Sequence, residues 1–342
     1  MSVAEIYAEF AAAEARGVSP IYERLGEFVA ADPDLLALIP DQTQPQLLFG
    51  VVRLLGGPVG DPVAFRDFTI ERWPAIEAEI RQRATQTNEP GRCAVLLPIL
   101  ASLPQPLALL EVGASAGLCL YPDRYSYRYG LRTLGGGRPV LESTLTGIEP
   151  PAARPEVVWR AGIDLNPLDV TDPGDVAWLD ALIWPDQLHR RDRLRQAAEI
   201  AAADPPLLVQ GDLVTDLPAL AAQAPAGATL VVFHTSVLYQ VPPSRWPSFR
   251  ETVRDLPGHW LANDIPDLIP DAPHPPDGNT YNLVALDGVP VAWTRSHGQA
   301  MIGIQPPSHD LTRSASPYGP AVSPALDQGS RSNLGPRFDR EP

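Results

Sequence analysis

Apolar and polar residues follow a helical pattern in the first third of the chain. Up to about residue 105, apolar residues recur every three or four positions, as they do on one face of an amphipathic helix. Ser19, Asp32 and Asp61 each precede a proline, a combination typical of a helix N-cap followed by the first helical residue. We therefore predict about four or five helices without strands, forming a helical cap region over residues 1–105.

Between residues 106 and 304 the pattern changes to short apolar runs of strand length that alternate with helical segments. Such an alternation predicts a parallel sheet with right-handed crossovers. Asp287-Gly288 lies between two further apolar runs and is typical of a β-hairpin turn, which would add antiparallel strands at one edge. We expect an α/β domain over residues 106–304. The first five strands are predicted at residues 107–112, 156–164, 206–213, 228–234 and 258–262.

Residues 305–342 show neither pattern. This segment is rich in serine, proline, glycine and aspartate, a composition that does not bury an apolar core. We predict a disordered tail without chemistry of its own.

The charge of the chain limits its partners. The formal net charge is −15, and all 26 basic residues are arginine. An acidic surface repels phosphate backbones, so we expect a small-molecule substrate and no nucleic acid. No apolar run reaches the roughly 18 residues of a membrane span, and the acidic N-terminus does not resemble a signal peptide. Cys93 and Cys119 lie in apolar runs without metal-ligand spacing, which favours a reduced, cytoplasmic setting and no metal site.

One strand ends in a turn of small residues. An apolar run ends at Glu111 and leads into Gly113-Ala114-Ser115-Ala116-Gly117, which is typical of a buried strand, a tight turn and the first turn of a helix. Such a junction presents main-chain N–H groups to a ligand at the carboxyl end of the strand. The dinucleotide fingerprint G-x-G-x-x-G matches only at Gly113, which disfavours a nicotinamide cofactor. An ordinary strand-to-helix turn without a ligand fits the same residues.

Three later strands also end in residues that suit a ligand. Asp164 ends the second strand, where a carboxylate can accept hydrogen bonds from both ribose hydroxyls; an Asx turn before Pro167 is the alternative. Asp212 and Leu213 end the third strand. His234 ends the fourth strand and is the candidate general base, because imidazole titrates near neutral pH; a core histidine fits equally well.

Residues outside the strands are candidates for a substrate pocket. One group precedes the first strand, and for Asn88 a helix N-cap is the alternative interpretation. A second group lies in a stretch rich in tyrosine and arginine, which suits an anionic or aromatic ligand, or packs against the helices. A third group follows the fourth strand. The candidates are Asn88, Glu89, Arg92, Arg124, Tyr125, Thr235 and Tyr239.

Four arginines lie on or near one predicted helix over residues 186–203. A basic cluster of this kind can bind phosphate, but acidic residues lie nearby in the same segment. We interpret it as a solvated helix face. The arginines are Arg190, Arg191, Arg193 and Arg195.

The order of these signals resembles that of class I S-adenosylmethionine-dependent methyltransferases, over about residues 106–304. Glu111, Gly113, Ser115 and Gly117 resemble the first motif of those enzymes, E/D-x-G-x-G-x-G, with Ser115 at the middle glycine. The resemblance implies a Rossmann-like, methyltransferase-type sheet that is mostly parallel and has an antiparallel terminal hairpin. It implies a methyltransferase that acts on a small molecule; a non-catalytic nucleoside-binding protein on the same fold is the alternative.

The same resemblance implies roles for individual residues. The glycine turn would lie beside the methionine part of S-adenosylmethionine, Asp164 would bind the ribose, and Asp212 would lie near the adenine amine. The residues from His234 to Tyr239 would contact the substrate. The implied cofactor-binding residues are Glu111, Gly113, Ala114, Ser115, Gly117, Asp164, Leu165, Asp212 and Leu213.

A closer resemblance runs from the N-terminal helices to about residue 300. It rests on Thr87-Asn88-Glu89-x-x-Arg92, the segments 110–118, 123–127 and 162–167, and Trp184-Pro185. These motifs are similar to those of a bacterial family of unknown function, which implies the architecture but no reaction. Asn263-Asp264 stands where we expect Asn-Glu in that family.

Overall fold

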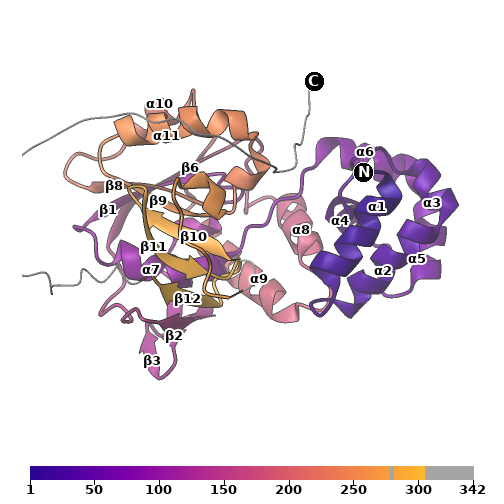
Figure 1. Cartoon of the computed structure of the whole chain (residues 1–342), viewed down its shortest axis with the longest axis horizontal. Helices are drawn as coiled ribbons and strands as arrows, with labels where there is room; N and C mark the ends of the chain where they lie inside the picture. Colours follow the sequence, from indigo (N-terminus) through magenta and orange to yellow (C-terminus); the bar gives the residue numbers. More distant parts are fainter. Residues whose placement is uncertain (278–280, 305–342) are drawn as a thin grey trace, which may run out of the picture. The chain divides into compact units, whose positions relative to one another are not determined.

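The N-terminal part of the chain is helical, as predicted (Figure 1). The computed structural model describes residues 1–277 and 281–304, so the tail expected from residue 305 lies outside the described residues. Residues 1–82 are all described and contain no strand. Their elements are α1 (Val3–Glu9), the π-helical segment η1 (Phe10–Ala15), α2 (Pro20–Ala31), α3 (Pro33–Leu38), α4 (Pro45–Leu54), α5 (Pro62–Glu71) and α6 (Trp73–Gln82).

The predicted caps start three of these helices. Ser19 Oγ accepts a hydrogen bond from Tyr22 N at 3.1 Å, and Asp32 Oδ1 accepts one from Leu35 N at 2.9 Å. Asp61 caps α5 in the same way. Each cap satisfies a main-chain donor that the helix leaves unpaired, and contributes about 1 kcal/mol.

A mixed sheet follows, in which most neighbouring strands are parallel. Its order is β5-β12-β11-β10-β9-β8-β1-β6-β7, and the strands from β9 to β7 are all parallel. The hairpin predicted at Asp287-Gly288 joins β10 to β11, and both turn residues have positive φ. The strands are β1 (Leu107–Val112), β5 (Thr144–Thr146), β6 (Val157–Asp164), β7 (Leu207–Gln210), β8 (Thr229–Thr235), β9 (His259–Asp264), β10 (Asn282–Leu286), β11 (Val289–Thr294) and β12 (Ala300–Gly303).

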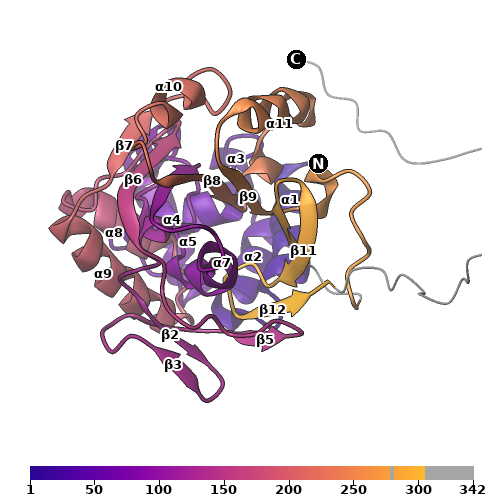
Figure 2. The ribbon, with the colours of Figure 1, turned by 90° about the vertical axis from the view of Figure 1, so that its left-hand side faces the viewer.

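Helices cover both faces of the sheet, which explains why β1 is buried along its whole length (Figure 2). Leu107 and Leu109 belong to one apolar cluster with α7 and α9, whereas Ala108 and Leu110 belong to another with α10 and α11. The helices of this region are α7 (Cys93–Leu100), α8 (Pro173–Leu182), α9 (Leu188–Ala203), α10 (Leu217–Ala221), α11 (Trp246–Asp255), and the short η2 (Pro90–Arg92), η4 (Leu238–Gln240), η5 (Pro243–Arg245) and η6 (Pro266–Leu268).

The helix expected directly after the glycine turn does not form. The chain makes only the short helix η3 (Leu118–Leu120) and then a small sheet of β2 (Ser126–Tyr129), β3 (Arg132–Leu134) and β4 (Val140–Glu142). Pro122 disfavours helical backbone in the residue before it, and the following tyrosines bury their rings. Tyr129 Oη, for example, donates a hydrogen bond to the carbonyl oxygen of Ala94 in α7 at 2.7 Å.

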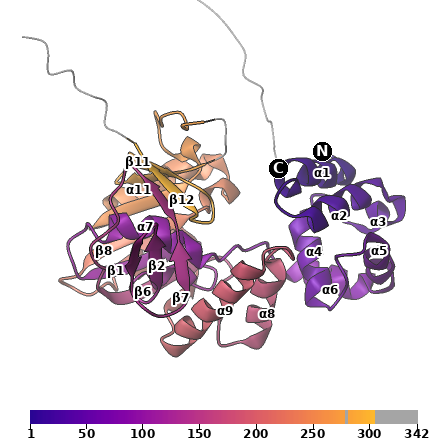
Figure 3. The ribbon, with the colours of Figure 1, turned by 90° about the horizontal axis from the view of Figure 1, so that it is seen from below.

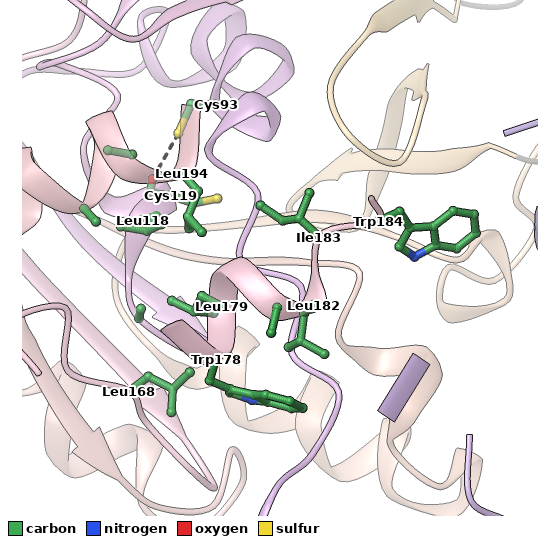
Figure 4. Close-up of a cluster of buried hydrophobic side chains, with 14 of the residues drawn as sticks. Cys93, Leu118, Cys119, Leu168, Trp178, Leu179, Leu182, Ile183, Trp184 and Leu194 are labelled. Atoms are coloured by element: carbon green, nitrogen blue, oxygen red, sulfur yellow. Dashed lines mark hydrogen bonds between the residues drawn. The ribbon is translucent and has the colours of Figure 1, made fainter. Parts of the chain in front are cut away.

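Helix α8 joins the apolar core of the N-terminal helices to that of the sheet (Figure 3). A Cβ atom at Gly50 in α4 would lie 3.1 Å from Leu182 Cδ2, so glycine allows the two helices to pack closely. Trp184, just beyond α8, contacts the rings of Phe10 and Tyr22, with centroids 5.6 and 5.5 Å away. Figure 4 shows Trp178, Leu179 and Leu182 among the buried side chains of this region. Among the described residues, no helix is long and apolar enough to cross a membrane.

Candidate functional site

A cavity of about 260 Å³ opens at the carboxyl ends of β1, β6, β7 and β8. After β1 the chain forms β6 and then β7 on one side of β1. It then crosses back and forms β8 on the other side of β1. Ligands of open α/β sheets bind at such a reversal of strand order. The cavity is lined by residues 84–89, Arg92, Glu111, Gly113, Ser115, Cys119, residues 163–166, Gly211, Leu213, residues 235–237 and residues 239–241.

The glycine turn has the backbone that its small residues predict. Gly113, Ser115 and Gly117 all adopt left-handed φ angles, of 68°, 50° and 71°. For Ser115 this conformation costs roughly 1–2 kcal/mol, which explains why glycine is usual at such a position. The Ser115 N–H donates a hydrogen bond to Asp164 Oδ2 at 2.7 Å, and this bond helps to hold the turn. Ser115 Oγ is buried and forms no hydrogen bond with the part of the chain that the structure describes.

Asp164 borders the cavity and also supports two turns. Its Oδ2 accepts from Ser115 N, and its Oδ1 accepts from Asn166 N at 2.8 Å, so the Asx turn considered from the sequence is present. Each carboxylate oxygen has a further lone pair, so Asp164 can still accept ligand hydroxyls. Leu165 lines the cavity beside it, and its carbonyl oxygen accepts from Gln210 Nε2 at 2.9 Å.

Glu111 is a buried acid at the cavity. Its side chain lies at the end of β1, the residue is 3% exposed, and no group in the described part of the chain forms a hydrogen bond with Oε2. Burial raises the pKa of Glu111 well above its usual value, and Arg92 opposes this shift. A buried acceptor without a partner costs about 1–3 kcal/mol, and such a group indicates a place where a ligand can supply the donor.

Cys119 also lines the cavity, although sequence reasoning assigned it no role. Its Sγ lies 3.4 Å from the carbonyl oxygen of Glu89, and its own carbonyl accepts from Cys93 Sγ (Figure 4). Burial and the neighbouring Cys93 raise the pKa of the Cys119 thiol. In the sequence, a role for Cys119 at the site is indicated by its position two residues after Gly117, the last residue of the glycine turn.

Asn88 reaches the site but is occupied by the glycine turn. Its Nδ2 donates to the carbonyl oxygen of Ala114 at 2.7 Å, and its Oδ1 accepts from Leu118 N at 3.0 Å. The amide therefore holds the turn from the segment between α6 and η2. This differs both from the expected substrate contact and from the alternative of a helix N-cap.

Glu89 is likewise satisfied within the protein. Its carboxylate accepts from Arg190 Nε at 2.6 Å and Arg193 Nε at 2.7 Å. Burial raises the pKa of Glu89, but the two guanidinium groups outweigh it and lower the pKa to about 2. Arg190 is buried, so the prediction of a solvated face was wrong for this residue.

The residues after β8 close one side of the cavity. Thr235, Ser236 and Tyr239 line it, and Ser236 adopts a left-handed φ of 54°. Ser236 Oγ accepts from Asn282 Nδ2 at 2.7 Å, and Thr235 accepts from Arg92 through its carbonyl oxygen at 2.9 Å. Thr235 and Tyr239 thus lie at the cavity, and their contact with a substrate stays a prediction.

His234 does not border the cavity. The residue is fully buried, and its ring stacks on Trp260 on the face covered by α11. Its Nδ1 lies 2.9 Å from Asp264 Oδ2, which also accepts from Val237 N and Leu238 N. Successive residues of a strand point to opposite faces, so Thr235 reaches the cavity where the histidine cannot. The alternative of a core histidine therefore describes its position.

Three further candidates lie outside the cavity lining. Asp212 accepts from Arg245 Nη2 at 2.7 Å, and chiefly this bond lowers the pKa of Asp212 to about 2. Its neighbours Gly211 and Leu213 do line the cavity. Ala114 and Gly117 shape the turn but are not among the lining residues.

The tyrosine-rich stretch does not reach the cavity. Tyr125 is buried, and its hydroxyl donates to the carbonyl oxygen of Leu118 at 2.7 Å. Arg124 is exposed and pairs with Asp123 at 3.2 Å and Asp204 at 3.4 Å. These contacts match the alternative in which the stretch packs on the protein.

Sequence comparison places the chain in a family. Neither the curated proteins nor the solved structures include a significant match. Within residues 1–277 and 281–304, no group of three or more His, Cys, Asp or Glu residues is placed to hold a metal ion. The resemblance to a bacterial family of unknown function, inferred from motifs on both sides of the cavity, is confirmed. The chain belongs to the family described as "Uncharacterized protein conserved in bacteria (DUF2332)", whose model matches residues 60–300.

Proposed function

We propose that the protein binds S-adenosylmethionine in this cavity and transfers its methyl group to a small-molecule acceptor. One observation carries the proposal: Glu111, the glycine turn and Asp164 line a single cavity. The cavity also lies where the parallel strands reverse their order, β7-β6-β1-β8-β9. This is the order 3-2-1-4-5 of Rossmann-like sheets that bind nucleotides.

The side chains at the cavity suit this cofactor. The carboxylate of Asp164 can accept the two vicinal ribose hydroxyls, and Glu111 can accept from the ammonium group of the methionine part. Burial raises the pKa of Glu111, so this side chain complements the ammonium group once it has released its proton, and Asp164 lies on the same cavity. No α-helix follows the turn, and the N–H groups of Gly113, Ser115 and Gly117 already donate within the protein, so the turn would contribute a close main-chain approach to the cofactor.

The adenine ring of the cofactor would contact other residues than Asp212, which the methyltransferase resemblance implied. Asp212 is paired with Arg245, so the residues available there are its neighbours Gly211 and Leu213. An apolar leucine side chain and main-chain groups suit a flat, weakly polar base.

When bound, S-adenosylmethionine supplies a methyl group on a sulfonium centre, which is already strongly electrophilic. The task of the protein is then chiefly to position the acceptor and exclude water. The hydroxyl groups of Thr235, Ser236 and Tyr239 line the cavity and would orient an acceptor. The cavity lining, as far as the structure describes it, contains no histidine, so His234 would act only through the loop that it supports with Asp264.

A second candidate function is binding without catalysis on the same fold. It is favoured by the absence of a histidine from the described lining and by the volume of about 260 Å³, which lies just below the range of roughly 300–1,000 Å³ for ligand pockets. Release of S-adenosylhomocysteine from S-adenosylmethionine in a bacterial extract distinguishes an enzyme from a binding protein.

Calorimetric titration tests the proposal. We expect S-adenosylmethionine and S-adenosylhomocysteine to bind and NAD not to bind. Asp164→Ala should weaken binding roughly 10- to 100-fold or more, because each hydrogen bond to a charged group contributes about 1.5–3 kcal/mol. Asp212→Asn is the matched control, an acid at a neighbouring strand end outside the cavity, and should leave binding unchanged. Absence of binding to both sulfur nucleosides rejects the proposal.

A further inference from the structure

Arg92 is a buried cation that pairs with no carboxylate of the residues that the structure describes. The residue is 6% exposed and lines the cavity. Its Nε donates to the carbonyl oxygen of Ser296 at 2.9 Å, and its Nη1 donates to that of Thr235 at 2.9 Å and, more weakly, to that of Thr87 at 3.4 Å. Among residues 1–277 and 281–304, no carboxylate pairs with Arg92, and its Nη2 makes no hydrogen bond.

The neighbouring arginines show what Arg92 lacks. Arg190 and Arg193 both pair with the carboxylate of Glu89, at 2.6 and 2.7 Å. Buried charges in proteins are normally paired, since an isolated buried ion loses its hydration without compensation. Neutral carbonyl groups hold Arg92 in place but leave its charge uncompensated.

Glu111 has the complementary property on the same cavity. Its Oε2 is buried and has no hydrogen-bond partner among the described residues, and no hydrogen bond joins its carboxyl group to Arg92. The two groups are close enough for Arg92 to oppose the upward shift in the pKa of Glu111. Within the described residues, one cavity therefore holds a cation without a carboxylate partner and an acid with an unsatisfied Oε2, and no hydrogen bond joins the two. A ligand with an anionic and a cationic group in close proximity would satisfy both.

We propose that Arg92 binds the carboxylate, and Glu111 the ammonium group, of an α-amino acid moiety in the ligand. The inference rests on the proposed function in so far as S-adenosylmethionine carries such a moiety. Arg92 lies in the segment before α7, outside the motifs that resemble a methyltransferase, and the assignment comes from its missing counter-ion. A purely structural role, in which Arg92 only ties residues 87, 235 and 296 together, is the competing explanation.

Two ligands separate these explanations. S-Adenosylhomocysteine carries the amino acid moiety, whereas 5′-methylthioadenosine has the same nucleoside and thioether without it. We expect the wild-type protein to bind S-adenosylhomocysteine roughly 10- to 100-fold more tightly in calorimetric titrations. Glu111→Gln and Arg92→Gln should each remove most of that difference and leave the affinity for 5′-methylthioadenosine unchanged.

Glu111→Gln keeps the experiment informative if Arg92→Gln fails to fold, since Glu111 Oε2 makes no hydrogen bond that the variant would break. Arg92→Lys preserves the charge and should retain part of the preference. Equal affinity of the wild-type protein for both ligands overturns the inference while the proposed function stands. Equal weakening of both ligands in the Arg92 and Glu111 variants also overturns it, in favour of a structural role.

If neither nucleoside binds, the proposed function fails and the amino acid subsite is tested alone. A mixture of the twenty L-amino acids at millimolar concentration should then raise the melting temperature of the wild-type protein but not of Glu111→Gln. The same shift in both proteins, or no shift, rejects the subsite as well.

Discussion

Replacement of Glu89 by glutamine should destabilise the protein strongly. Glu89 is 2% exposed and is the counter-ion of Arg190 and Arg193, which come from α9 about a hundred residues later. Glutamine keeps the size of the side chain but leaves two guanidinium groups without their anion. Breaking a buried ion pair from one side costs about 3–5 kcal/mol.

The pKa of Glu89 gives a second, independent magnitude. It falls from 4.5 to about 2 on folding, which corresponds to about 3 kcal/mol of stability at neutral pH. Because the pKa of the folded state is the lower one, this contribution is complete above the unfolded value of 4.5. It is lost as the pH falls through 4.5 towards 2, and roughly half remains near pH 3.

Urea unfolding followed by circular dichroism measures the effect. A matched control involves arginines of the same helix: Asp180 in α8 accepts from Arg191 at 2.5 Å and Arg195 at 3.3 Å, both in α9, but these arginines are more exposed. Asp180→Asn should therefore cost at most about 1 kcal/mol. A loss below about 1 kcal/mol for Glu89→Gln at pH 7 refutes the reasoning, as does a difference from the wild-type protein that does not shrink below pH 4.

Three further predictions concern the site. Asn88→Ala should destabilise the protein by about 1–3 kcal/mol, because it leaves the Leu118 N–H unpaired and removes one of the two hydrogen bonds to the Ala114 carbonyl; equal melting temperatures contradict this. Ser115→Gly should stabilise it by roughly 1 kcal/mol in urea, since glycine adopts positive φ without strain, and a destabilised variant argues against that explanation. If Glu111 releases a proton when an ammonium group binds, the binding enthalpy measured at one pH will vary with the ionisation enthalpy of the buffer; no variation excludes such release.

The sequence predicts those parts of the fold that local signals determine. Apolar runs marked the five parallel strands, and Asp-Pro and Ser-Pro pairs marked helix starts. The missing helix after the glycine turn and the edge strands β5 and β12 depend on distant contacts instead. β5 pairs with β12, about 150 residues away, and no local pattern specifies that partner.

The sequence predicted that residues at the strand ends form the candidate site. It did not predict which of the candidate side chains are already paired with other residues of the protein. Glu111 and Asp164 line the cavity because the carboxyl ends of adjacent parallel strands meet there. His234 was misplaced because a shift of one residue along a strand moves a side chain to the other face. Asp212 and Glu89 looked available because the arginines that neutralise them lie far away in the sequence.

The decisive experiment is a crystal structure of the protein grown with S-adenosylhomocysteine. We predict that the nucleoside lies in the cavity, with its ribose hydroxyls hydrogen-bonded to Asp164 and its amino acid moiety between Arg92 and Glu111. A nucleoside bound elsewhere, or a cavity closed by side chains in the presence of saturating ligand, contradicts it.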